Sequence, residues 1–353
     1  MKKKILFPFV GDSLGGSHLS ALNFIKKLDT KKFQINILLH ERGRLYFYLK
    51  KKNIKFKFIK LNLDKNIKNI FFRPISLFNN LLKFRTYVKK NNIDIIHGND
   101  LRINVFWSLV AFRSRKFIWH QRTLIKNNSK IEYFALWLSK FIICISDEVK
   151  NSFKDSKNKK LIKIYNIFNF QKKIYFNKND KVIFLLCSKL IKNKNVNIYF
   201  QIIDKLNRTK NNFIFWIVGD GDQLMYYKKK FQSVRNVKFF GFQINTTKFF
   251  RSANILINPS RIEAFGRTIV ESLSNGTFVI ASNINSFKEI ENKKDLITFA
   301  ENNSNSFIKK INLSLKNKNY LNKKNIQKKF EKKLVKKFSK TNILKIENLY
   351  NDK

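Results

Sequence analysis

Short apolar runs rich in β-branched residues alternate with longer segments in which apolar residues recur every three or four positions. The short runs predict strands, and the longer segments predict helices. In the first half of the chain, the predicted strands are residues 5–10, 33–40, 54–61, 93–96, 116–120 and 141–145, and the predicted helices are 18–28, 45–52, 74–91, 102–112 and 130–139. This alternation predicts a parallel sheet with helices on both faces.

The alternation restarts after a polar segment rich in Lys and Asn around residues 172–180. The predicted strands are then 181–187, 212–218, 237–240, 255–258 and 278–281, and the predicted helices are 195–206, 224–231, 246–252, 266–274 and the segment from 304 onward. A length of 353 residues also predicts two domains, at about 100–200 residues per domain.

The predicted fold class is therefore α/β, with two facing Rossmann-like domains at residues 1–170 and 171–335. Ligands of such folds bind outside the carboxyl ends of the strands, so we expect the site in the cleft between the domains. Residues 336–353 are expected to form a helix that packs back toward the N-terminal domain. The apolar stripe of the C-terminal segment also permits an amphipathic helix on a membrane surface; it comprises Phe330, Leu334, Phe338, Ile343 and Leu344.

The charge is strongly positive, with 73 Lys and Arg against 23 Asp and Glu and a formal net charge of +50. Lys, Asn, Ile and Phe abound together, which is typical of coding bias in an AT-rich genome. Binding to an anionic membrane surface and binding to nucleic acid are the alternatives. Only 13 of the basic residues are Arg, and Lys lacks the bidentate geometry that reads phosphates and bases. Specific nucleic-acid binding is therefore the least favoured alternative.

Several other classes of protein are disfavoured by composition. Cys144 and Cys187 both lie in apolar runs and form neither a disulfide framework nor a Cys-based zinc site. Four His and few clustered carboxylates argue against a metal site. The longest apolar stretches fall short of the roughly 20 residues that span a membrane, and the run at 5–10 is too short for a signal peptide. We expect a cytoplasmic protein, with peripheral attachment to the inner face of the plasma membrane as an option.

The most informative segment is residues 255–290, where a predicted strand leads into a turn and a helix. Gly266 permits a sharp turn, and the helix that follows it begins with N–H groups that suit a phosphate. Glu263 precedes the turn and Glu271 lies in the helix. Because a carboxylate accepts hydrogen bonds from hydroxyls, we expect one of these two Glu residues to bind a ribose.

Residues 263–271 read Glu-Ala-Phe-Gly-Arg-Thr-Ile-Val-Glu, and this segment resembles the Glu-x7-Glu motif of the retaining glycosyltransferases of family 4, or glycosyl transferases group 1. These enzymes have the two-domain GT-B fold. The resemblance implies that Glu263 lies near the transferred sugar and that Glu271 holds the ribose. It also places three residues between them in the donor site: Ala264, Phe265 and Gly266.

A second segment of the same family precedes the helix at 195–206. The residues Cys187-Ser188-Lys189-Leu190, with Lys194-Asn195 after them, resemble the family's Gly-Arg-Leu-x-x-x-Lys-Gly segment. The resemblance implies that Lys189 and Lys194 clasp the donor diphosphate. Ser188, Lys189 and Asn195 depart from the family's Gly, Arg and Gly, and Lys189 retains the charge without the bidentate geometry.

The N-terminal half resembles the family more weakly. Gly15-Gly16 fits either the family's glycine loop, which approaches the donor phosphates, or a plain turn. His120 ends a strand at the position of the family's active-site histidine, with a structural role as its alternative. His97 and Asn99 follow a neighbouring strand and are candidates for the acceptor side, and His97 also fits a structural role. The resemblance thus gives His120, Glu263 and Lys194 as the candidate catalytic residues.

The resemblance implies transfer of a hexose from a UDP- or GDP-sugar, with retention, to a glycan or lipid-linked acceptor. The implied setting is synthesis of lipopolysaccharide, capsule or exopolysaccharide. No metal or cofactor is expected, because protein cations and helix ends neutralise the leaving group in this family. Two alternatives stay open: a catalytically degenerate GT-B protein, and a basic membrane- or nucleic-acid-binding protein without catalysis.

Overall fold

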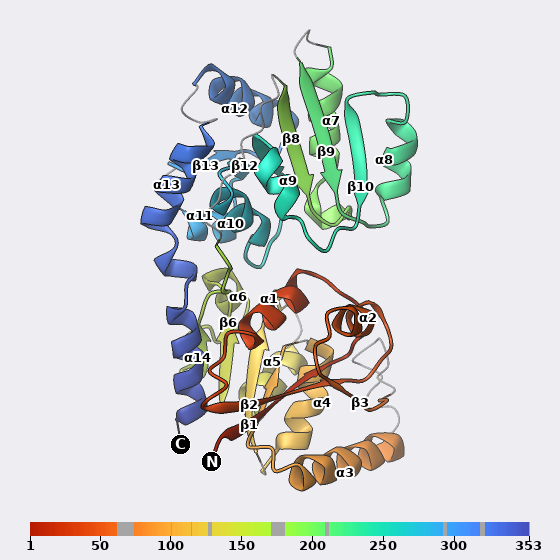
Figure 1. Ribbon diagram of the computed structural model, residues 1–353, viewed down its shortest axis with the longest axis vertical. Coiled ribbons are helices and arrows are strands. Elements are labelled where there is room, and N and C mark those ends of the chain that lie inside the picture. The colour runs from red at the N-terminus through yellow and green to blue at the C-terminus, as the bar shows by residue number, and fades with distance from the viewer. Residues whose placement is uncertain are drawn as a thin grey trace. The chain divides into compact units, whose positions relative to one another are not determined.

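The computed structural model describes residues 1–61, 74–99, 101–113, 115–125, 129–170, 181–208, 212–291, 295–317 and 322–352. The chain forms two compact units, one of Met1–Phe168 with Phe338–Lys353 and one of Asn169–Lys337. Each unit is built on its own parallel sheet, as Figure 1 shows. The predicted α/β class with two parallel sheets is therefore confirmed. The polar segment at 172–180 lies outside the described residues.

The first unit holds a seven-stranded parallel sheet in the order β3-β2-β1-β4-β5-β6-β7. Its strands are β1 (Lys3–Phe9), β2 (Phe33–Leu39), β3 (Lys57–Phe58), β4 (Ile95–Gly98), β5 (Lys116–Gln121), β6 (Phe141–Cys144) and β7 (Leu161–Lys163). The helices between them are α1 (Gly16–Ile25), α2 (Arg44–Lys51), α3 (Pro74–Lys90), α4 (Leu101–Ala111), α5 (Ser129–Leu138) and α6 (Asp147–Asn151). The strand predicted at 54–61 shrinks to two residues at the sheet edge, where lysines alternate with its apolar residues. The short elements α6 and β7 were not predicted.

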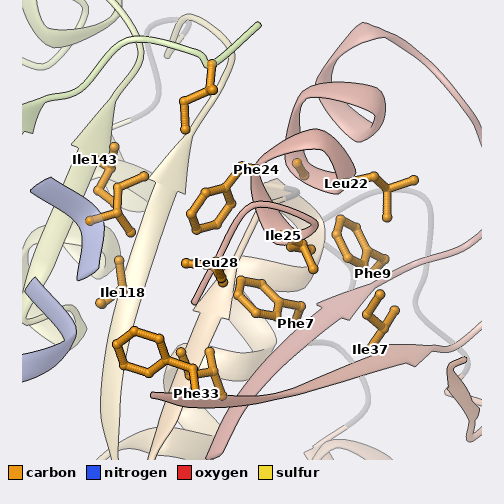
Figure 2. Close-up of a cluster of buried hydrophobic side chains, with 14 of the residues drawn as sticks. Phe7, Phe9, Leu22, Phe24, Ile25, Leu28, Phe33, Ile37, Ile118 and Ile143 are labelled. Atoms are coloured by element: carbon orange, nitrogen blue, oxygen red, sulfur yellow. The ribbon is translucent and has the colours of Figure 1, made fainter. Parts of the chain in front are cut away.

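A cluster of buried apolar side chains joins α1 to this sheet (Figure 2). Side chains of a strand alternate between the two faces, so Phe7 and Phe9 of β1 point to the same side. They meet Leu22 and Phe24 of α1 there, and Ile118 of β5 belongs to the same cluster. Every second residue along each of these strands therefore points to the core face of the sheet.

The second unit holds a six-stranded parallel sheet in the order β10-β9-β8-β11-β12-β13. Its strands are β8 (Val182–Cys187), β9 (Phe213–Val218), β10 (Val237–Gly241), β11 (Ile255–Asn258), β12 (Phe278–Ser282) and β13 (Ile297–Ala300). Its helices are the 3-10 turn η2 (Lys192–Lys194), α7 (Asn197–Leu206), α8 (Leu224–Lys230), α9 (Thr247–Ser252), α10 (Arg267–Ser274), α11 (Asn285–Ile290), α12 (Ser304–Lys316) and α13 (Lys323–Lys333). The short α11 and β13 were not predicted.

The C-terminal segment is divided into separate helices. After α12 and α13, the 3-10 turn η4 (Lys336–Phe338) leads to α14 (Thr341–Asn351). Phe330 and Leu334 are buried in the second unit, whereas Phe338 and Ile343 are buried in the first. Leu344 is 55% exposed, so it does not belong to the buried stripe. The apolar face of α14 packs into the core of the first unit. This packing buries the side chains that a membrane-surface helix would insert into the bilayer.

Candidate functional site

Two groups of polar residues lie at the carboxyl edges of the two sheets, one group in each unit. In the second unit, β8 and β11 are parallel neighbours, so their carboxyl ends meet at the same edge. The turn η2 follows β8, and α10 follows β11 after a short loop. The predicted residues of segments 187–195 and 263–271 are thereby brought to one edge of one sheet.

Lys194 and Glu263 form an ion pair at this edge. Each side chain is only 20% exposed, so the pair is largely shielded from water. The backbone also joins the two loops, because the Arg261 N–H donates to the Asn193 carbonyl at 3.3 Å. Two candidate catalytic residues that are 69 positions apart in the sequence are therefore in direct contact.

Asn195 adopts the left-handed conformation, with φ of 51°. Asn is among the few residues other than Gly that take this conformation at low cost. Its side chain is buried and donates through Nδ2 to the side-chain Oδ1 of Asn302 at 2.5 Å. The departure from the family's Gly at this position is thus accommodated by the backbone.

Gly266 places the start of α10. Its φ is 99°, and a Cβ there would lie 2.8 Å from the Phe287 ring. Both the conformation and the close approach therefore require glycine. Phe265 is buried beside it, and Ala264 is half-buried. The first N–H groups of a helix have no partner within the helix, which gives this end of α10 a positive potential.

Glu271 forms an ion pair with Arg267, one turn earlier on α10. The pair opposes the helix dipole, because the cation lies at the positive end of the helix. Arg267 therefore adds to the positive potential at the start of α10. Burial raises the pKa of the Cys187 thiol at the end of β8, and the nearby charge of Glu271 raises it further. The sequence analysis missed Arg267, although its spacing of four from Glu271 was a visible signal.

Lys189 stands apart from these pairs. It is exposed, and among the described residues its ammonium has no hydrogen bond or ion pair. The turn after β9 presses on the loop that carries Lys189, since a Cβ at Gly219 would lie 1.7 Å from the Ser188 carbonyl oxygen. The geometry requires Gly219 for this close turn. The structure thus brings Lys189, Lys194, Glu263 and Glu271 to one edge of the sheet, with Lys189 exposed and outside the two ion pairs.

In the first unit, strand alternation aligns a second group of polar residues. Ile95 of β4 and Ile118 of β5 both point into the core cluster, and His97 lies opposite Ile118 in the register. Two residues further along each strand, the same face carries His97 on β4 and His120 on β5. Both side chains are buried.

These residues form a continuous set of hydrogen bonds. The Tyr350 hydroxyl lies 2.7 Å from His97 Nδ1, and His97 Nε2 lies 3.1 Å from His120 Nδ1. Arg122 Nη2 lies 3.2 Å from the same His120 nitrogen. The guanidinium also donates to Asn99 Oδ1 at 3.0 Å and 3.2 Å, and to Asn166 Oδ1 at 2.7 Å. The predicted His97, Asn99 and His120 are therefore brought together.

Burial lowers the pKa of His97 and of His120 well below the usual range, and the positive charge of Arg122 lowers both further. Both imidazoles are therefore neutral at neutral pH. His120 Nε2 is buried and has no hydrogen-bond partner in the part of the chain that the structure describes. Arg122 and Tyr350 were missed in the sequence; Arg122 follows His120 by two positions, whereas nothing local marks Tyr350.

Gly15 and Gly16 lie at the start of α1. The Gly15 backbone is extended, and a Cβ there would meet no heavy atom within 4 Å. The Gly15 N–H donates to His18 Nδ1 at 3.3 Å. Glycine at position 15 is therefore not required by the fold of this unit.

Two further features concern metals and membranes. Within the described ranges, no group of three or more His, Cys, Asp or Glu side chains is arranged to hold a metal ion. Among the same residues, no helix combines the length and the apolar character needed to cross a bilayer.

Comparisons with known proteins agree with this architecture. Residues 167–333 match the model of the family described as glycosyl transferases group 1. An uncharacterized glycosyltransferase of Methanocaldococcus jannaschii, MJ1178, is 27% identical over 90% of this chain and 88% of its own length. The O-antigen biosynthesis glycosyltransferase WclY of Escherichia coli is 32% identical over 33% of this chain and 31% of its own.

Among solved structures, Anabaena HepE in complex with UDP and glucose superimposes with a TM-score of 0.79. The match covers 99% of this chain and all of HepE at 18% identity, and HepE has also been solved with UDP-glucose. At this identity the likeness shows the fold. The chain has the GT-B fold, and its residues 167–333, with the Glu-x7-Glu segment at the start of α10, match the glycosyl transferases group 1 family.

Proposed function

We propose that this glycosyltransferase moves a hexose from a UDP-sugar, with retention of configuration, to a glycan or lipid-linked acceptor of a surface polysaccharide. The observation that carries the proposal is the shielded Lys194–Glu263 pair beside the start of α10. A cation, a helix N-terminus and two carboxylates at one edge suit a nucleoside diphosphate attached to a sugar. The complexes of HepE with UDP and UDP-glucose favour uridine over guanosine, and WclY supports the polysaccharide setting.

The proposed roles follow from charge and position. Lys194 and the start of α10, reinforced by Arg267, stabilise the negative charge that develops on the departing diphosphate. Glu271 accepts hydrogen bonds from the ribose, and Glu263 orients hydroxyls of the transferred sugar. Lys189 is exposed and unpaired among the described residues, so its ammonium can turn toward the diphosphate without breaking a bond. His120 offers a hydrogen bond to a substrate oxygen.

Titration calorimetry with UDP and GDP tests the donor part of this proposal. We expect UDP to bind the wild-type protein more tightly than GDP, and Lys194→Ala to lose most of that binding. No binding of either nucleotide would contradict the proposal. Because protein cations neutralise the leaving group, we expect transfer to continue in EDTA; a requirement for Mg²⁺ or Mn²⁺ would contradict that part.

We further propose that α3 docks the first unit on an anionic membrane surface, where a lipid-linked acceptor is at hand. Ile75, Phe78 and Leu82 are 78%, 61% and 48% exposed, and their spacing places them on one side of the helix. Residues 74–90 contain no acidic residue and four basic ones. Large apolar side chains beside cations suit an anionic bilayer, at about 1 kcal/mol per basic residue near the surface.

Vesicle co-sedimentation tests this docking. We expect binding to vesicles that contain phosphatidylglycerol, weak binding to pure phosphatidylcholine, and loss of binding in the triple variant Ile75→Ser, Phe78→Ser, Leu82→Ser. A matched triple variant at exposed apolar positions elsewhere, Tyr133→Ser, Trp137→Ser, Met225→Ser, controls for general loss of apolar surface. Equal binding of both triple variants would contradict docking through α3.

A further inference from the structure

The C-terminal helix α14 contributes one polar group to the interior of the first unit. Tyr350 is fully buried, and its ring packs edge-on against Phe33 with centroids 5.3 Å apart. The helix is held in place by Glu347, which accepts a hydrogen bond from the Asp29 N–H at 3.0 Å. Within this apolar environment the Tyr350 hydroxyl meets His97 Nδ1 at 2.7 Å. A buried tyrosine hydroxyl needs such a partner.

The direction of every hydrogen bond in this set follows from Arg122. A guanidinium only donates, so His120 Nδ1 accepts from Arg122 and the proton of the neutral His120 ring is on Nε2. His97 Nε2 faces the same His120 nitrogen at 3.1 Å and must therefore donate to it. The remaining nitrogen of His97, Nδ1, then accepts from the Tyr350 hydroxyl.

Both rings are held in the neutral form that this pattern needs. Burial and the charge of Arg122 disfavour the imidazolium of either histidine. Burial raises the pKa of Tyr350, and the nearby charge of Glu347 raises it further, so the hydroxyl stays protonated. A protonated hydroxyl has the proton that this pattern needs it to donate.

The set ends in a hydrogen-bond donor without a partner. His120 Nε2–H is buried and unsatisfied in the described structure. A buried polar group without a partner is costly, so its retention points to a ligand that satisfies it. The unpartnered nitrogen lies on the residue that the family resemblance gives as a candidate for catalysis.

We propose that Tyr350 is a positioning residue which, by donating to His97 Nδ1, acts with Arg122 to hold His97 and His120 in the Nε2–H tautomers, so that His120 donates a hydrogen bond to a substrate oxygen. The identity of the substrate rests on the proposed function, whereas the tautomers do not. Without the hydroxyl, His97 Nδ1 loses its hydrogen-bond donor, while Arg122 still makes His120 Nδ1 an acceptor. His97 then keeps only its hydrogen bond to His120 and is held less firmly.

Nitrogen-15 NMR of the full chain with labelled histidine tests the tautomers directly, since the chain has four His. We expect Nε2–H for His97 and His120 at pH 7.5. His40 is an internal reference for the opposite tautomer, Nδ1–H. Its Nδ1 donates to the Ile59 carbonyl at 2.8 Å, and its Nε2 accepts from Trp107 at 3.1 Å. In Tyr350→Phe, we expect the Nδ1 resonance of His97 to move, because that nitrogen loses its hydrogen bond, while the resonances of His40 stay unchanged. Nδ1–H on His120 in the wild type, or an unshifted His97 in the variant, would overturn the proposal.

Steady-state kinetics supply the second test. We expect Tyr350→Phe to lower kcat roughly three- to tenfold, the range of one net hydrogen bond, with KM for the UDP-sugar little changed. The matched pair His97→Gln and His97→Met has similar side-chain shapes, but only Gln can accept from Tyr350 and donate to His120. We therefore expect His97→Gln to stay within about threefold of wild type and His97→Met to lose as much as Tyr350→Phe.

Equal kcat for the Gln and Met variants would overturn the positioning role, and this pair remains informative if Tyr350→Phe does not fold. Wild-type tautomers as expected, together with no transfer from any UDP-sugar, would instead refute the proposed function and leave the tautomer assignment standing. The two failures are therefore distinguishable.

Discussion

The ammonium of Lys194 is paired with the carboxylate of Glu263, and both side chains are four-fifths shielded from water. A diphosphate that approaches Lys194 must therefore compete with Glu263 for the same cation. We predict that Glu263→Gln, which removes the competing charge, tightens UDP binding severalfold and lowers sugar transfer at least tenfold. Titration calorimetry and a transfer assay measure the two effects separately. Weaker UDP binding in Glu263→Gln would contradict this competition and would show that Glu263 positions Lys194 for the diphosphate.

The pair between Arg267 and Glu271 predicts a stability effect that can be separated from function. Glu271→Ala leaves a mostly buried guanidinium without its carboxylate, so we expect a loss of about 1–3 kcal/mol in the free energy of unfolding. The double variant Arg267→Ala, Glu271→Ala should recover much of this stability, because no charge is left unpaired.

Transfer should remain low in the double variant, since the ribose has lost its acceptor. Chemical denaturation and the transfer assay check the two halves of this prediction. Recovery of transfer together with stability would contradict the assignment of Glu271 to the donor.

Two glycines should respond in opposite ways to alanine. Gly15 has an extended backbone with open space around its Cβ position, so Gly15→Ala should change stability by less than about 0.5 kcal/mol. Gly219 has φ of 143°, and a Cβ there would overlap the Ser188 carbonyl, so Gly219→Ala should cost about 1–3 kcal/mol or more.

Gly15→Ala should nevertheless slow transfer if the loop before α1 approaches the donor phosphates, as the family resemblance implies. Unchanged transfer in this variant would favour the plain-turn interpretation of Gly15-Gly16. A thermal melt of each variant, measured beside its transfer rate, distinguishes the two roles.

The buried histidines make stability dependent on pH. Burial lowers the pKa of His40 to about 4, and burial with Arg122 lowers those of His97 and His120. The unfolded chain takes up protons below about pH 6.5, whereas the folded chain does not until the lower values are reached. Stability should therefore fall as the pH drops from about 6.5 toward 4, by up to about 1.4 kcal/mol per pH unit for each histidine.

Urea denaturation at pH 7.5, 6 and 5 measures this dependence. His97→Gln removes one of the three groups and should make the slope shallower. A free energy of unfolding that is the same at pH 7.5 and pH 5 would contradict the buried neutral histidines.

Much of the fold was predictable because its signals are local. Strands such as β8 and β9 are continuous apolar runs, and helices such as α7 repeat apolar residues every three or four positions. The elements that escaped prediction are short, such as β7 with three residues and β13 with four, and a few residues carry no period. The apolar stripe from Phe330 to Leu344 is divided among α13, η4 and α14, because periodicity alone does not show where one helix ends and the next begins.

The contact between Lys194 and Glu263 was predictable for a different reason. Glu263, Gly266 and Glu271 belong to a dense motif, and the contact of Glu263 with Lys194 brings together two segments that both carry family signals. Tyr350 carries no such signal, because it lies 253 residues from His97 in an ordinary amphipathic helix. Its contact with His97 depends on the tertiary structure, because α14 packs against the face of the sheet that carries His97 and His120.

A transfer assay with purified wild-type protein and a panel of UDP- and GDP-sugars measures the proposed activity itself. Products are identified by mass spectrometry, and their anomeric configuration by NMR. We expect a glycoside formed from a UDP-sugar with the configuration of the donor retained, and no detectable product from Lys194→Ala under the same conditions. An inverted product, or wild-type rates in Lys194→Ala, would contradict the proposed activity.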